Sequence, residues 1–195
     1  MILPIYAYGH PILRKETEEI EELNEEMKTL IANMFETMYG SRGVGLAAPQ
    51  IGKALRLFII DGSPFAEDEA ETEEEEKENE FLKTFKRVFI NPIIEEEHGE
   101  EWGFEEGCLS IPGIREEVFR EENVVISYYN EDWELIEEEF TGLAARVVQH
   151  EYDHIEGKLF TDYLSPLKKR LIKRKLTDIS KGIVPVKYKM TFPKK

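Results

Sequence analysis

Hydrophobic residues recur at helical spacing between residues 24 and 39. Asn24 precedes the pattern as a candidate N-cap, and Gly40 follows it. Spacings of three and four residues turn one face of a helix toward the core. The positions on this face are Met27, Leu30, Ile31, Met34, Phe35 and Met38. The pattern predicts an amphipathic helix that packs against the rest of the protein.

Four later runs are rich in β-branched and aromatic residues, which is typical of strands. They cover residues 56–61, 85–94, 123–130 and 133–140. A polar segment at 130–132 separates the last two runs and predicts a tight turn. We therefore expect these two strands to pair as a hairpin.

Two helices are predicted in the last third of the chain. The first runs from Thr141, a candidate N-cap, to about Gly157, and its small and apolar residues indicate that it is largely buried. The second begins at Ser165 and Pro166, a cap followed by proline, and ends near Gly182. Its expected inner stripe consists of Leu167, Leu171, Ile172, Leu176 and Ile179.

The order of these elements predicts the fold class. One helix, several strands and two further helices favour an α+β fold over alternating βαβ units. We expect a single domain over residues 1–182, with antiparallel or mixed strands packed around the helix at 141–157. Residues 183–195 are expected to form a tail in which 183–190 add a short strand. Pro185 would restrict that strand to a sheet edge.

Composition limits the class of protein. A chain of 195 residues with 41% hydrophobic residues is long enough to bury one core. It lacks an apolar stretch of roughly 18 residues and a secretory signal at its start, so a cytoplasmic protein with no membrane partner is expected. The one cysteine excludes an internal disulfide and agrees with a reducing compartment.

Charge is distributed unevenly along the chain. The formal net charge is −16, and residues 67–80 are almost entirely acidic, so we expect a mobile surface loop there. Residues 165–195 hold eleven Lys or Arg against one Asp. The overall charge argues against specific DNA binding, whereas a local basic helix at 166–181 can still dock on phosphates.

The segment QHEYDH contains the pattern His-Glu-x-x-His at His150, Glu151 and His154. On a helix, residues four apart share one face, so both imidazoles can reach one metal ion. Glu151 then lies where a carboxylate can accept a proton from water. Three polar residues in an apolar helix need partners, and a metal ion would supply them.

A catalytic site of this kind needs a third protein ligand. Downstream of His154 there is no further histidine, and Asp162 and Asp178 are the remaining candidates. Upstream, Cys108 lies in a turn bounded by Gly and Pro at 105–113, which favours a Cys-His-His site. Two other functions stay open: a metallopeptidase that cleaves internal bonds through one of the aspartates, and a non-catalytic module that binds metal or docks on the ribosome.

Three segments together resemble the motifs of the peptide deformylase family, in the same order. They are GVGLAAPQIG at 43–52, EGCLS at 106–110 and QHEYDH at 149–154, and the likeness extends over about residues 1–180. The resemblance implies removal of the formyl group from the N-terminal formylmethionine of new peptides, giving formate and a free amine. Neither the acidic segment 67–80 nor the tail after Gly182 is expected to touch a motif.

The resemblance also implies residue roles. Cys108, His150 and His154 would hold one divalent ion, Fe²⁺ in the cell, with Zn²⁺, Ni²⁺ or Co²⁺ also able to bind. Glu151 would be the proton carrier. The side-chain amide of Gln50 and the backbone N–H of Leu109 would stabilise the oxyanion.

Further residues are expected to contact the substrate. Gly45 lies where the family brings its backbone against the peptide. Val44, Ile111 and Val147 lie beside the motifs and are predicted to line an apolar pocket for the methionine side chain. The expected partners are N-formylmethionyl nascent peptides and, through the basic helix at 166–181, the ribosome.

Overall fold

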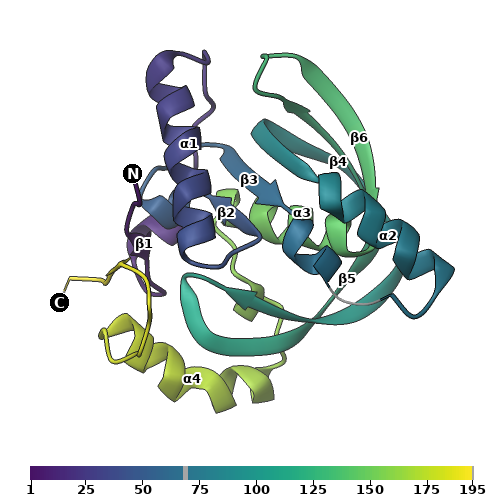
Figure 1. Ribbon diagram of the computed structural model, residues 1–195. Coiled ribbons are helices and arrows are strands. Elements are labelled where there is room, and N and C mark those ends of the chain that lie inside the picture. The colour runs from purple at the N-terminus through teal and green to yellow at the C-terminus, as the bar shows by residue number, and fades with distance from the viewer. Residues whose placement is uncertain (68–69, 195) are drawn as a thin grey trace.

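The computed structural model describes residues 1–67 and 70–194 (Figure 1). Its main sheet has five strands in the order β2-β3-β4-β5-β6, and every neighbouring pair is antiparallel. The strands are β2 (Gly45–Ala47), β3 (Leu57–Asp61), β4 (Lys86–Cys108), β5 (Ile111–Tyr129) and β6 (Leu135–Thr141). The helices are α1 (Glu25–Gly40), α2 (Glu73–Thr84), α3 (Gly142–Ile155) and α4 (Pro166–Ser180).

The strands surround α3, as expected for this α+β fold (Figure 1). Ala145 and Val148 of α3 are fully buried and pack with Phe58 of β3 and Val124 of β5 in one core cluster. Register shifts along β4 bend the long β4–β5 hairpin. The hairpin therefore curves around the helix and brings its closed end to the helix face that carries the two histidines.

Helix ends agree closely with the sequence predictions. Asn24 caps α1, since its side chain accepts a hydrogen bond of 3.0 Å from the backbone N–H of Met27. Ser165 caps α4 in the same way, with Pro166 as the first helical residue. Strands are less well predicted, because β4 extends to Cys108, well beyond residue 94.

The prediction of an acidic loop at 67–80 is wrong for residues 73–80, which begin α2; residues 68 and 69 lie outside the described residues. Thr72 caps this helix. The four glutamates in its first turn are stabilised by the positive end of the helix dipole. Leu82 and Phe85 anchor the segment because both are almost fully buried. Local capping and these two apolar residues outweigh repulsion among the acids.

The predicted inner stripe of α4 is too wide. Ile172, Leu176 and Ile179 are buried, but Leu167 and Leu171 are 68% and 72% exposed. The helix packs against one side of β5 and near the chain termini, so only a narrow face is covered.

The tail forms a strand later than predicted. Residues 183–189 are irregular, and β7 (Met190–Thr191) pairs in parallel with β1 (Ile5–Tyr6) near the N-terminus. This two-stranded sheet is separate from the main sheet. Within the described residues, no helix has the length and apolar character needed to cross a bilayer.

Candidate metal and catalytic site

Two elements bring three potential metal ligands together. Cys108 ends β4, while His150 and His154 lie one turn apart on α3. Their ligand atoms all lie within 4.8 Å of one another, and the Cys108 Sγ is 3.3 Å from the His154 Nε2. The Cys-His-His group predicted from the sequence is thus assembled by the fold.

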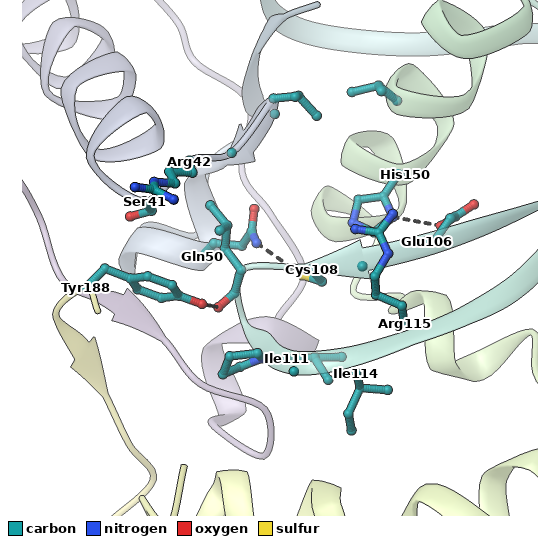
Figure 2. A pocket seen from close by; sticks show the side chains of 18 of the residues that line it. Ser41, Arg42, Gln50, Glu106, Cys108, Ile111, Ile114, Arg115, His150 and Tyr188 are labelled. Atoms are coloured by element: carbon teal, nitrogen blue, oxygen red, sulfur yellow. Dashed lines mark hydrogen bonds and ion pairs between the residues drawn. The ribbon is translucent and has the colours of Figure 1, made fainter. Parts of the chain in front are cut away.

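The surrounding groups suit a bound ion. The Nδ1 of His150 lies 2.8 Å from a carboxylate oxygen of Glu106, which can only accept, so the opposite ring nitrogen is left for a metal (Figure 2). One thiolate and two imidazoles suit Fe²⁺, Zn²⁺, Ni²⁺ or Co²⁺. Among the described residues, the buried Oε2 of Glu151 has no hydrogen-bond partner, as expected beside a site for an ion and its water.

Glu151 is buried between α3 and β2. A Cβ at Gly45 would overlap the Glu151 carboxylate, so glycine is required for the close approach of these elements. Burial raises the pKa of Glu151 to about 7, although the nearby His150 opposes this shift. A carboxyl group with such a pKa can both accept and release a proton near neutral pH.

Gln50 and the turn after Cys108 face the same cavity (Figure 2). The side-chain Oε1 of Gln50 accepts a hydrogen bond of 2.9 Å from the Ala47 N–H, which fixes the orientation of the side-chain amide. Its Nε2 then donates to the Ser110 hydroxyl at 3.2 Å and lies 3.4 Å from the Cys108 Sγ. Leu109 and Ser110 form the turn between β4 and β5.

The cavity has a volume of about 550 Å³. All the residues predicted for catalysis or substrate contact line it: Val44, Gly45, Gln50, Leu109, Ile111, Val147 and Glu151. Cys108 and His150 also reach it. Phe65, Phe104 and residues 185–188 line it as well and were not anticipated. The expectation that the tail touches no motif is wrong, because Tyr188 contacts Leu109.

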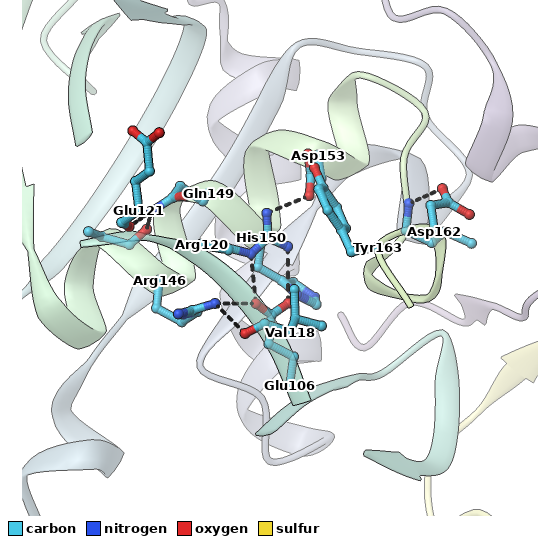
Figure 3. A network of polar contacts seen from close by, with 12 residues as sticks. Glu106, Val118, Arg120, Glu121, Arg146, Gln149, His150, Asp153, Asp162 and Tyr163 are labelled. Carbon is cyan, nitrogen blue, oxygen red and sulfur yellow. Dashed lines mark hydrogen bonds and ion pairs between the residues drawn. The ribbon is translucent and has the colours of Figure 1, made fainter. Parts of the chain in front are cut away.

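A buried polar network supports the ligands from behind (Figure 3). Glu106 accepts hydrogen bonds from Arg120 at 2.7 and 3.0 Å, from Arg146 at 3.1 Å and from the ring of His150. Arg120 also donates to Asp153, one residue before His154. Burial alone would raise the pKa of Glu106, but hydrogen bonds from His150 and Arg120 hold it far below its usual value.

Sequence reasoning missed Glu106 and Arg120. Glu106 lies two residues before Cys108, so the alternation of a strand was a usable signal that both side chains share a face. Arg120 comes from the facing strand, and no local pattern marks it among the many charges of the chain. Gln149 donates to backbone carbonyls of Glu121 and Ala145 and does not contact a ligand.

The aspartates considered for a peptidase site are not at this centre. Asp162 pairs with Arg14 at 2.5 and 2.9 Å and accepts from the Leu159 N–H. Asp178 belongs to the last turn of α4 and does not line the cavity. The geometry therefore favours the class of metal-dependent hydrolases, with Cys108 beside the two histidines as the third potential ligand.

Comparison with known proteins agrees with this class. The family model described as polypeptide deformylase matches residues 2–170. The peptide deformylase of Christiangramia forsetii is 58% identical over 99% of this chain and 97% of its own. A crystal structure of a peptide deformylase from Legionella pneumophila has a TM-score of 0.77 and 40% identity, covering 95% of this chain and all of that one.

A third match is a crystal structure of peptide deformylase from Plasmodium falciparum, with a TM-score of 0.78 and 34% identity over 91% of this chain and 95% of that one. The chain belongs to the polypeptide deformylase family. Its activity is the metal-dependent hydrolysis of the N-terminal formyl group of new peptides. The comparisons do not favour an endopeptidase.

Proposed function

We propose that, within this deformylase activity, Cys108, His150 and His154 hold the divalent ion and Glu151 carries the proton. The ion is Fe²⁺ in the cell, and Zn²⁺, Ni²⁺ or Co²⁺ can replace it in purified protein. When bound, it supplies a Lewis acid that activates water and polarises the formyl oxygen. The observation that carries the proposal is the buried Oε2 of Glu151 beside the Cys-His-His group, which has no hydrogen-bond partner in the part of the chain that the structure describes.

Glu151 accepts a proton from the attacking water and then donates it to the nitrogen of the departing amine. The bond formed joins the water oxygen to the formyl carbon, and the bond broken is the C–N bond of the formamide. Formate and the free amine are the products. A group with a pKa near 7 suits both proton transfers.

Gln50 and Leu109 stabilise the negative charge that develops on the formyl oxygen. Support comes from the fixed amide of Gln50, whose Nε2 lies beside Cys108 at the cavity. The backbone N–H of Leu109 is the second donor. Donors held in place before the reaction are more effective than mobile ones, because no reorganisation is needed.

The methionine side chain binds against Val44, Ile111 and Val147, with the Gly45 backbone beside the peptide. A charged residue in this apolar wall would disfavour the substrate. Replacing Val147 by Asp is expected to raise KM for formyl-Met peptides at least about tenfold while metal content is retained. Unchanged KM would remove Val147 from the pocket.

Ligation by Cys108 is tested by the Cys108→Ser variant. Because a thiolate is replaced by a weak hydroxyl ligand, the variant is expected to lose most of its bound metal during dialysis. An endopeptidase that uses Asp162 as third ligand would retain it. Metal analysis of both proteins after the same dialysis distinguishes the two assignments.

The α4 helix is proposed to dock on ribosomal RNA, which places the enzyme in the cytoplasm. Lys169, Lys173 and Arg174 are exposed on this helix, as is the apolar residue Leu171. Charge reversal of the three basic residues is expected to weaken co-sedimentation with ribosomes. Turnover of a free formylated peptide should not change, since none of the three lines the cavity. Unaltered co-sedimentation would contradict docking through α4.

A further inference from the structure

The C-terminal tail returns to the active site after α4. Pro185, Val186, Lys187 and Tyr188 line the same cavity as Cys108, His150 and Glu151. The match to the family model ends at residue 170, so these residues come from outside the matched segment. Their role in the site is therefore argued from their contacts in the structure.

Tyr188 makes the most specific contact of this segment. Its hydroxyl donates a hydrogen bond of 2.7 Å to the backbone carbonyl of Leu109. Burial raises the pKa of Tyr188 above that of a free tyrosine, so the hydroxyl keeps the proton that it donates. The side chain thus holds the residue whose N–H is proposed to stabilise the oxyanion.

The tail itself is anchored to the N-terminal segment by backbone hydrogen bonds. The N–H groups of Ile5 and Ala7 donate to the carbonyls of Lys189 and Thr191, each at 2.9 Å. Lys189 directly follows Tyr188, so the tyrosine backbone has little freedom. Pairing of β7 with β1 therefore turns the end of the chain into a fixed support for the turn after Cys108.

Three contacts from different parts of the sequence hold this turn. The Gln50 Nε2 donates to the Ser110 hydroxyl, and the Tyr8 N–H donates to the Ser110 carbonyl at 2.9 Å. Tyr188 supplies the third contact, at the Leu109 carbonyl. The N–H of Leu109 lies in the peptide plane shared with Cys108, the last residue of β4, and its carbonyl lies in the next plane. The strand holds the first plane and Tyr188 holds the second, so together they limit the rotation of the N–H about the Leu109 Cα.

We propose that Tyr188 is a positioning residue for the Leu109 N–H and that residues 185–187 form one wall of the peptide groove. The proposal rests on the oxyanion role assigned above to Leu109. An oxyanion donor that is free to reorient stabilises the transition state less, because aligning it during the reaction costs free energy. The wall would contact the peptide that follows the formylated methionine.

The Tyr188→Phe variant tests the positioning role, with Tyr128→Phe as its control. Tyr128 also donates its hydroxyl to an acceptor, Glu138, and does not line the cavity. In the metal-loaded full-length chain, Tyr188→Phe should lower kcat about tenfold with KM for formyl-Met-Ala-Ser changed less than about twofold. Tyr128→Phe should leave both constants unchanged. A purely structural role would lower the melting temperature of Tyr188→Phe but not its kcat at 25 °C.

Hydrogen exchange tests the wall without relying on turnover. The product Met-Ala-Ser, added in excess, should slow amide exchange in residues 183–192 of the wild type, while exchange in α2, which does not line the cavity, stays the same. Equal kcat for wild type and Tyr188→Phe, together with unchanged exchange in the tail, would overturn the proposal. If the wild type releases formate in the same assay, the deformylase function is not affected by that result. Absence of formate release from the wild type would instead contradict the function, and slower exchange would still support the wall.

Discussion

At the scale of single residues, a carboxylate orients the proposed ligand His150. This carboxylate belongs to Glu106, the first residue of the EGCLS motif, to which the sequence analysis gave no role. Glu106 contacts His150 and two buried guanidinium groups, those of Arg120 and Arg146. A buried carboxylate is stable only when such partners compensate for its lost hydration. The potential metal site and the charged network behind it are therefore linked through Glu106.

The Glu106→Gln variant is expected to bind metal about 10–100-fold more weakly, because the His150 ring loses its charged partner. Glu105→Gln is the matched control, since the neighbouring Glu105 is exposed. Competition with a chelator measures the affinities. Equal affinity in both variants would contradict a role of Glu106 in orienting the ligand.

Glu106 also predicts how stability depends on pH. Its pKa is depressed in the folded state, so the unfolded chain binds more protons at low pH. The stability that Glu106 contributes is present above the ordinary pKa of 4.5 and is lost as pH falls below it. Denaturant unfolding of the metal-free protein between pH 3 and pH 7 should show a shallower acid dependence for Glu106→Gln than for wild type. Identical slopes would exclude this contribution.

At the scale of elements, capping and periodicity predicted α1, α3 and α4 because those signals are local. Asn24 and Ser165 cap the helices that they precede. The same rules apply to α2, where Thr72 is the cap, but the run of glutamates suggested a loop. The outer half of β4 was missed because its alternation is hidden by charged residues on both faces. The pairing of this part of β4 with β5 depends on the partner strand and not on the local sequence.

Helix α2 has a function in the fold that its composition does not reveal. Glu78 accepts a hydrogen bond of 2.8 Å from the Leu143 N–H, in the first turn of α3, where Thr141 makes no side-chain cap. Glu78→Ala removes the acceptor and should lower stability by about 1 kcal/mol, or about 2–4 °C in melting temperature. Glu80→Ala, an exposed change outside the first turn of the same helix, should have little effect. Equal melting temperatures for the two variants would contradict the cap.

The narrow face of α4 gives a second test at this scale. Ile172 is 5% exposed whereas the adjacent Leu171 is 72% exposed. Ile172→Ala should cost about 2–5 kcal/mol of unfolding free energy, and Leu171→Ala less than about 0.5 kcal/mol. Denaturant unfolding measures both. A similar loss of unfolding free energy in both variants would mean that Leu171 is also packed against the core, as the sequence predicted.

At the scale of the whole molecule, the cavity is built from segments far apart in the chain. The second and third motifs supply the potential ligands, and the first adds Gln50 and Gly45, so their grouping could be predicted from sequence. The contributions of Arg120 and Tyr188 could not, because each depends on a long-range contact that no spacing rule encodes. The basic surface of α4 on an acidic chain is likewise visible in the sequence, while its exposed leucines are not.

The most direct test of the account is formate release from formyl-Met-Ala-Ser by protein prepared without oxygen and loaded with Fe²⁺, beside the Glu151→Gln variant with its metal content measured. The wild type should release formate, and Glu151→Gln should be at least about 10²-fold slower while both retain metal, because the variant lacks its proton carrier. Equal rates in the two proteins would contradict the role of Glu151. A metal-loaded wild type that releases no formate would contradict the assigned reaction.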